Sequence, residues 1–145
     1  MLVAGAHGRL GNRVAQLLLR RGHLVRALVR TPAQAAVLED AGAETVVADL
    51  TQDVEWTAEG CTAAVFAAAA RYRSELGSID AGGAAKLAEA ADRYGFRRFV
   101  LCSVVGADRP ERRNGAVREL LGPSSTRNGG WRLSGCRGRS CASAR

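Results

Sequence analysis

The stretch LVAGAHGRLGNRVAQLLLRRGHLVRALVR, residues 2–30, contains the pattern that decides the fold. A short apolar run leads into three glycines, Gly5, Gly8 and Gly11, spaced GxxGxxG. An amphipathic segment follows at residues 12–21, with apolar side chains at helical spacing, and a second apolar run comes after it. This order predicts a strand, a glycine turn, a helix and a second strand.

The same alternation continues through residue 103. Apolar runs predict strands at residues 2–6, 24–29, 45–50, 63–70 and 96–103. Helices are predicted at residues 12–21, 32–41, 53–59 and 80–94, the second with a proline near its start. Strands that are apolar throughout and separated by helices indicate a parallel sheet covered on both faces. The predicted fold class is therefore α/β, a doubly wound parallel sheet of about five strands.

The last part of the chain has a different composition. Residues 123–145 are rich in Ser, Gly and Arg, with no apolar periodicity, and we expect a disordered tail after a single domain at residues 1–122. The chain has a net charge of +7, and five of its arginines but no acidic residue lie in the tail. The domain is left with 16 basic and 14 acidic residues. Because the domain is nearly neutral and poor in aromatic residues, nucleic acid is not an expected partner.

Other classes are disfavoured by what the sequence lacks. No apolar run approaches the roughly 18 residues of a membrane span, and no signal peptide precedes the first strand, so we expect a soluble, cytoplasmic protein without a membrane partner. The four cysteines form no CxxC pair and have no histidine at ligand spacing, which disfavours a metal site and disulfides. The oligomeric state is left open.

Two interpretations of the glycine triplet compete. The glycines could merely permit a tight strand-to-helix turn, or they could cradle the pyrophosphate of a dinucleotide at the start of the helix. Their context within a βαβ unit favours the cradle. We expect the whole loop to contact the dinucleotide, namely Gly5, Ala6, His7, Gly8, Arg9, Leu10 and Gly11.

With GHLVRALVR after it, the glycine stretch resembles the atypical short-chain dehydrogenase/reductase superfamily, in particular its NmrA-like NAD(P)H-binding group. VVADLTQ is similar to the family's third strand, CTAAVFAAAA to its fourth, and SIDAGGAAKLAEAADRYGFRRFVLCSVVGADRP to the following helix and fifth strand. The resemblance covers about residues 1–110 and implies a Rossmann fold.

The end of the second strand bears on the choice of cofactor. NAD-selective fingerprints place an acidic residue there, whereas this chain has Arg30 followed by Thr31. A guanidinium can bind a 2′-phosphate bidentately, so NADP is the expected cofactor and NAD is less favoured. Arg9 is a second candidate phosphate contact. The alternative for both arginines is that they are only solvated.

The resemblance assigns further cofactor contacts. Asp49 and Leu50 match the Asp-Leu pair that contacts adenine, although Asp49 could equally be a turn or capping aspartate. Ala67, Ala68 and Ala69 are expected to pass close to the ribose and nicotinamide. Gly82 and Gly83 would each cost a helix roughly 1 kcal/mol relative to alanine, so close packing or the cofactor must favour them.

Catalytic members of the superfamily place a Ser or Thr after the fifth strand and a Tyr-x-x-x-Lys on the next helix. Ser103 matches the first feature, with a polar strand cap as the alternative. The second feature is missing, because Tyr72, Tyr94 and Lys86 all precede Ser103 and no other tyrosine or lysine exists. Tyr94 is expected at the opposite end of the sheet from the site.

Three functions are compatible with a cofactor-binding loop and an incomplete catalytic motif. The first is a dinucleotide-dependent oxidoreductase that acts on a small carbonyl or enone substrate; the second is a non-catalytic NADP(H) sensor, and the third is a shortened, inactive chain. The third function is considered because members of the superfamily continue beyond GADRP through another helix and strand. Back-translating residues 131–141 in a shifted reading frame permits a family-like strand, so the hypothesis is that the tail is a frameshifted remnant. An upstream start is also left open.

Overall fold

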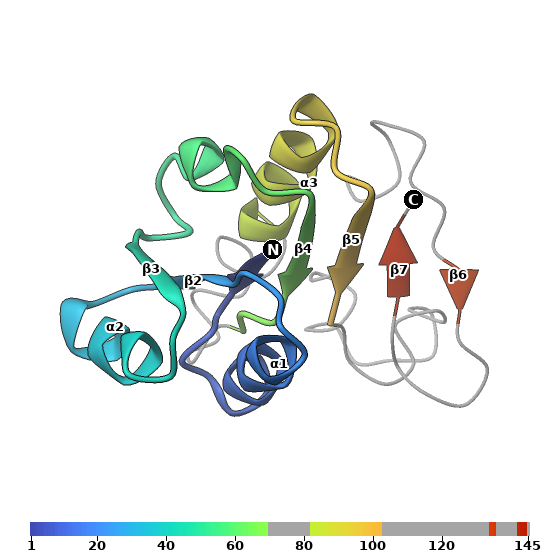
Figure 1. Ribbon diagram of the computed structural model, residues 1–145. Coiled ribbons are helices and arrows are strands. Elements are labelled where there is room, and N and C mark those ends of the chain that lie inside the picture. Colours follow the sequence, from blue (N-terminus) through green and yellow to red (C-terminus); the bar gives the residue numbers. More distant parts are fainter. Residues whose placement is uncertain (70–81, 103–133, 136–141, 145) are drawn as a thin grey trace, which may run out of the picture.

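The fold is an open α/β sheet, shown by a computed structural model that describes residues 1–69, 82–102, 134–135 and 142–144 (Figure 1). Its parallel strands are β1 (Leu2–Ala4), β2 (Arg26–Val29), β3 (Glu44–Val47), β4 (Ala63–Phe66) and β5 (Arg98–Leu101). They lie in the order β3-β2-β1-β4-β5, so that β1 is central. The predicted five-stranded, doubly wound parallel sheet is confirmed.

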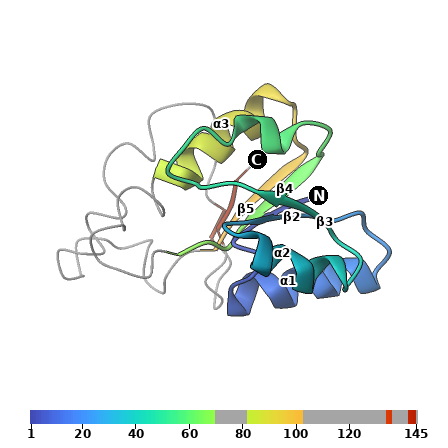
Figure 2. The same cartoon turned by 90° about the vertical axis from the view of Figure 1, so that its left-hand side faces the viewer.

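Helices cover both faces of this sheet. They are α1 (Arg9–Arg20), α2 (Pro32–Glu39), the single 3-10 turn η1 (Glu55–Ala58) and α3 (Ala84–Arg93). In the side view of Figure 2, α1 and α2 lie on one face of the sheet and α3 lies on the other. The strands therefore have two buried faces and need apolar side chains in both directions.

The core is divided by the sheet into two clusters. Because successive strand residues point to opposite faces, Val3 and Ala27 pack under α1 and α2, whereas Leu2, Leu28 and Phe66 pack under α3. All five side chains are at most 2% exposed. Burying one large apolar side chain contributes about 1.5–3 kcal/mol, which explains why the buried positions of the strands are apolar on both faces.

The helices differ from their predicted limits at their first turns. The first helix was expected at residues 12–21, but α1 begins at Arg9 because Gly8, with an extended backbone, is already its N-cap. Pro32 is the first residue of α2, as expected. The predicted helix at residues 80–94 is observed as Ala84–Arg93, and residues 80 and 81 lie outside the described part.

Two short strands extend the sheet beyond β5. They are β6 (Ser134–Gly135) and β7 (Ala142–Ala144), and β7 pairs antiparallel with β5. We expected a disordered tail at residues 123–145, and the residues described within it form these two short strands. No periodicity could indicate them, because Ser-Gly and Ala-Ser-Ala have no alternation of apolar and polar side chains. The domain limit at residue 122 stays a prediction.

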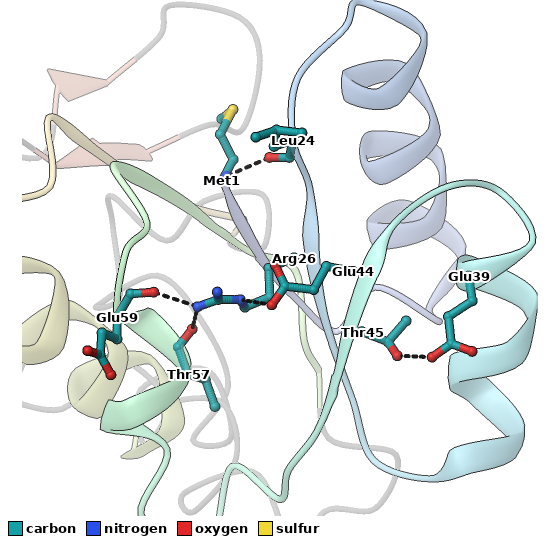
Figure 3. A network of polar contacts seen from close by, with 8 residues as sticks. All are labelled: Met1, Leu24, Arg26, Glu39, Glu44, Thr45, Thr57 and Glu59. Carbon is teal, nitrogen blue, oxygen red and sulfur yellow. Dashed lines mark hydrogen bonds and ion pairs between the residues drawn. The ribbon is translucent and has the colours of Figure 1, made fainter.

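A polar network ties the amino ends of the strands together (Figure 3). The Arg26 guanidinium donates to the Glu44 carboxylate on β3 at 2.9 Å and to the main-chain oxygens of Thr57 and Glu59 at 3.1 and 2.5 Å. Arg26 thus joins β2 to its neighbour and to the segment that leads into β4. This network lies at the opposite edge of the sheet from the glycine loop.

Within the described ranges, no helix is long and apolar enough to cross a membrane. In the same ranges, no group of three or more His, Cys, Asp or Glu residues could hold a metal ion.

Candidate cofactor site

The glycine loop lies between β1 and α1, at the carboxyl end of the central strand. The chain order reverses at this point, since β2 lies on one side of β1 and β4 on the other. In open α/β sheets the crevice at such a switch point is where ligands bind. The loop is thus in the place that the sequence predicted.

Two of the three glycines are required by close backbone contacts. Gly5 has a φ of +75°, and a Cβ added there would lie 2.6 Å from the Cα and N atoms of Ala68. A Cβ on Gly11 would lie 2.2 Å from the carbonyl oxygen of Gly5. These distances exclude any side chain, so Gly5 brings β1 against the end of β4 and Gly11 brings α1 against the loop.

The middle glycine has a different surrounding. A Cβ on Gly8 would meet only the Gly5 carbonyl oxygen, at 3.2 Å, and Gly8 itself is exposed. No side chain caps α1, and no acidic residue occupies its first turn. The first amides of a helix carry partial positive charge and have no partner within the helix. The start of α1 is therefore open to an anion, which fits a pyrophosphate.

The remaining loop residues divide by exposure. Ala6 is buried in the core under α1, whereas the side chains of His7, Arg9 and Leu10 are exposed. The Gly8 amide donates to the Gly5 carbonyl at 3.0 Å, which closes the turn. Three side chains of the loop are thus accessible at the surface, and the buried Ala6 anchors the loop.

Arg30 lies directly after β2, at the same edge of the sheet as the glycine loop. Its amide donates to the Gln34 side-chain oxygen at 2.9 Å, which fixes the backbone at the start of α2. The guanidinium is exposed and makes no ion pair with any side chain of the described residues. It is available for an anionic ligand.

Asp49 forms a local turn after β3. Its carboxylate accepts from the Thr51 amide at 2.9 Å and from the Thr51 hydroxyl at 2.8 Å. These two hydrogen bonds lower the pKa of Asp49 below its ordinary value of 3.8. Burial opposes them, and the nearby charges of Arg30 and Lys86 lower the pKa further. Asp49 is thus a turn aspartate, one of its two predicted roles, and it is ionised and exposed.

The end of β4 completes the described site. The Ala67 amide donates to the Ala4 carbonyl at 2.9 Å, and Ala68 touches Gly5. Ala67 and Ala68 are half-buried and Ala69 is exposed. The sheet therefore brings these alanines beside the glycine loop.

The structure describes the chain up to the residue before the predicted catalytic Ser103. Ser103 lies outside the described residues, but the amide of Cys102, just before it, donates to the Phe66 carbonyl at 2.9 Å. Tyr94 ends α3 next to the start of β5, at the opposite edge of the sheet, as expected. Tyr72 lies outside the described residues.

Sequence reasoning missed one residue of this region. Lys86 was noted only as unsuited to a catalytic dyad, yet its ammonium donates to main-chain oxygens of the loop after β3. The contact joins segments about 35 residues apart, so no local pattern could indicate it. Gly83 has a related role, because a Cβ there would lie 3.1 Å from the Leu50 Cβ, and close packing therefore explains this helix glycine.

A family model described as NAD(P)H-binding matches residues 5–127. The chain belongs to this NAD(P)H-binding family. The match begins at the first glycine of the loop and includes every predicted cofactor contact.

Similar proteins support the assignment of the chain to the NAD(P)H-binding family. The chain is 36% identical over 126 residues to the uncharacterized sugar epimerase YhfK of Bacillus subtilis (strain 168), a match that covers 81% of this chain and 58% of YhfK. A solved structure from Bacillus halodurans, named for the NAD-dependent epimerase/dehydratases, is 32% identical with a TM-score of 0.75, over 83% of this chain and 58% of that one.

A short-chain dehydrogenase/reductase superfamily protein from Agrobacterium tumefaciens, solved with bound NAD, is 29% identical with a TM-score of 0.64. That match covers 79% of this chain and 35% of the Agrobacterium chain. The predicted resemblance to the atypical short-chain dehydrogenase/reductases is thus confirmed. The chain spans little more than half the length of YhfK and of the Bacillus halodurans protein.

Proposed function

We propose that the chain binds NADP(H) across the carboxyl ends of β1 and β4 as part of an oxidoreductase. The observation that carries the proposal is the contrast within the glycine loop. Gly5 and Gly11 are closed against backbone, whereas Gly8 is exposed at an uncapped helix start. A turn that only changed the chain direction would not need an open, positively polarised helix end.

The residues present fit the two ends of a dinucleotide. Pyrophosphate would lie on the loop from Gly5 to Gly11, with Arg9 beside it, while Asp49 and Leu50 would contact adenine. The second ribose and the nicotinamide would pass Ala67, Ala68 and Ala69. Small side chains there leave space for a flat ring, and Ala67 and Ala68 belong to the backbone that Gly5 approaches.

The preference for NADP(H) over NAD(H) is supported by Arg30. Arg30 directly follows β2, at the position where NAD-selective fingerprints have an acidic residue. Its guanidinium forms no ion pair with the described side chains. A guanidinium pairs with a phosphate through two parallel hydrogen bonds, whereas it gains far less from a ribose hydroxyl. Arg9 could supply a second positive charge from the glycine loop.

We further propose a small carbonyl or enone as the substrate, with the chain placed in the NmrA-like group. The bound nicotinamide would supply or accept a hydride at C4. Ser103 would hold the substrate oxygen, because in the sequence it directly follows Cys102, whose amide donates to the Phe66 carbonyl at the end of β4. A hydroxyl donor at that point can stabilise charge that develops on the oxygen.

A second candidate function is a non-catalytic NADP(H) sensor. Two observations support this candidate. Tyr94 lies at the far edge of the sheet, and the ammonium of Lys86, the chain's only lysine, is bonded to carbonyl oxygens. Neither can supply the proton transfer that a Tyr-Lys pair provides.

Titration of NADPH and NADH, followed by nucleotide fluorescence, tests the binding proposal. We expect the wild type to bind NADPH more tightly, and Arg30→Ala to raise the NADPH Kd about 10- to 100-fold while the NADH Kd changes little. Arg97→Ala, which removes an exposed arginine at the amino end of β5, is the matched control and should leave both unchanged. The proposal fails if neither nucleotide binds at micromolar concentration.

Turnover separates the enzyme from the sensor. NADPH consumption with any member of a panel of small carbonyl and enone compounds supports the oxidoreductase. Tight NADPH binding without consumption supports the sensor. Loss of consumption in Ser103→Ala at unchanged NADPH Kd would support the assigned role of Ser103.

A further inference from the structure

Lys86 makes an unusual set of contacts for a surface lysine. It lies on α3, and its Nζ is 2.9 Å from the Thr51 oxygen, 2.8 Å from the Gln52 oxygen and, at a longer 3.4 Å, from the Leu50 oxygen. An ammonium has three donors. The donors of Lys86 are thus directed at three consecutive carbonyls of the loop after β3.

The choice of partners is informative because carboxylates are close by. Asp53, Glu55 and Glu89 line the same hollow of about 390 Å³ beside Lys86. Even so, neither of the two ion pairs found among the described residues involves Lys86. The hydrogen bonds of the lysine therefore go to main-chain oxygens rather than to these carboxylates.

Gly83 holds the same loop from a second direction. It lies one helical turn before Lys86, and a Cβ there would be 3.1 Å from the Leu50 Cβ. Leu50 is consequently only 8% exposed and packs in the core beneath α3. The start of α3 thus fixes Leu50 by packing and the next two residues by charge-assisted hydrogen bonds.

The loop that α3 fixes carries Asp49 and Leu50. The Asp49 carboxylate accepts from both the amide and the hydroxyl of Thr51, so the position of Thr51 sets the direction of the carboxylate. Lys86 holds the Thr51 carbonyl on the other side of the same residue. Movement of Thr51 would therefore turn the Asp49 carboxylate.

We propose that Lys86 is a positioning residue of the adenine subsite, which fixes the Asp49–Thr51 turn so that the Asp49 carboxylate accepts a hydrogen bond from the adenine amino group. This inference rests on the proposed function, because it needs a bound dinucleotide with adenine at Asp49. It assigns the chain's single lysine to cofactor recognition rather than to catalysis.

Lys86→Met tests the proposal, because it keeps the aliphatic stem and removes the donors. We expect the NADPH Kd to rise about tenfold. The reduced hypoxanthine analogue of NADP lacks the adenine amino group, so its Kd for the wild type should be higher than that of NADPH. Lys86→Met should change the Kd of this analogue by less than about twofold. Lys86→Arg keeps a cationic donor and should restore most of the NADPH affinity.

Arg93→Met is the matched control. Arg93 is also on α3 and pairs with Glu55 of η1 at 2.5 Å, and no hydrogen bond or ion pair joins it to the described residues 49–52. It should leave the NADPH Kd unchanged. The inference is overturned if Lys86→Met binds NADPH like the wild type, or if it loses NADPH and the hypoxanthine analogue equally. A wild type that binds no dinucleotide would instead overturn the proposed function, and the inference with it.

Discussion

Gly5 and Ala68 bring two strand ends into backbone contact. A Cβ on Gly5 would lie 2.6 Å from the Cα and the N atom of Ala68, a distance that real side chains do not adopt. Gly5 also has a φ of +75°, which disfavours any other residue. The contact holds the glycine loop against the segment that follows β4, which is where the dinucleotide would lie in the proposed function.

Gly5→Ala should therefore destabilise the protein in two ways. The left-handed backbone costs about 1–2 kcal/mol, and the forced overlap with Ala68 adds about 1–3 kcal/mol. Gly22 has a nearly identical φ of +78° but no atom within 4 Å of its Cβ position, so Gly22→Ala should show only the first cost. Urea unfolding measures both variants. Equal losses would mean that the contact with Ala68 is unimportant.

Gly8→Asp separates folding from binding. The extended backbone of Gly8 accepts any residue, and an aspartate is a favourable N-cap, so the free energy of unfolding should stay within about 1 kcal/mol of the wild type. The new carboxylate would face the pyrophosphate and raise the NADPH Kd at least about tenfold. Titration calorimetry and urea unfolding provide the two measurements.

Gly8→Asn is the control for Gly8→Asp, because it has the same shape without the charge. A smaller loss of NADPH affinity in Gly8→Asn identifies electrostatic repulsion as the cause. If both variants bind NADPH like the wild type, the phosphates do not lie at the start of α1.

The sheet could be predicted because its physical cause is local. A strand that is buried on both faces needs apolar side chains in both directions, and this marks it in the sequence; β1 and β4 are clear examples. The strands of the tail could not be predicted in this way. Ser134–Gly135 and Ala142–Ala144 owe their place to pairing with a distant strand rather than to their own composition.

The site was predictable to the extent that it depends on backbone. The glycine spacing located the loop, and the end of the second apolar run located Arg30, since both follow from chain order. The contact of Lys86 with Thr51 depends on how α3 packs over the loop after β3, and the approach of Gly5 to Ala68 depends on the register of β1 and β4. Neither leaves a pattern in a single sequence.

The pH dependence of stability should report the Asp49 turn. The hydrogen bonds from Thr51 lower the pKa of Asp49 in the folded protein, so its contribution to stability is present above its ordinary pKa of 3.8 and is lost as the pH falls through the lower folded value. Asp49→Asn should abolish this pH-dependent contribution to the free energy of unfolding. Between about pH 6 and pH 3 the wild type should therefore lose more stability than Asp49→Asn.

Thermal unfolding across that pH range measures the difference. Asp40→Asn, at the end of α2, removes one negative charge elsewhere and is the control for net charge. If Asp49→Asn follows the wild type at every pH, the ionised carboxylate does not stabilise the turn.

Arg26 should matter for stability and not for binding. Its side chain is only 21% exposed and holds two carbonyls in addition to Glu44, so Arg26→Met leaves three acceptors without their donor and should cost about 1–3 kcal/mol. Glu44→Gln weakens only the ion pair with a carboxylate that is 62% exposed, and should cost less than about 1 kcal/mol. Because the network lies at the amino ends of the strands, the NADPH Kd of both folded variants should stay within about twofold of the wild type. Equal costs for the two variants in urea unfolding would show that the ion pair, and not the hold on Thr57 and Glu59, stabilises this edge.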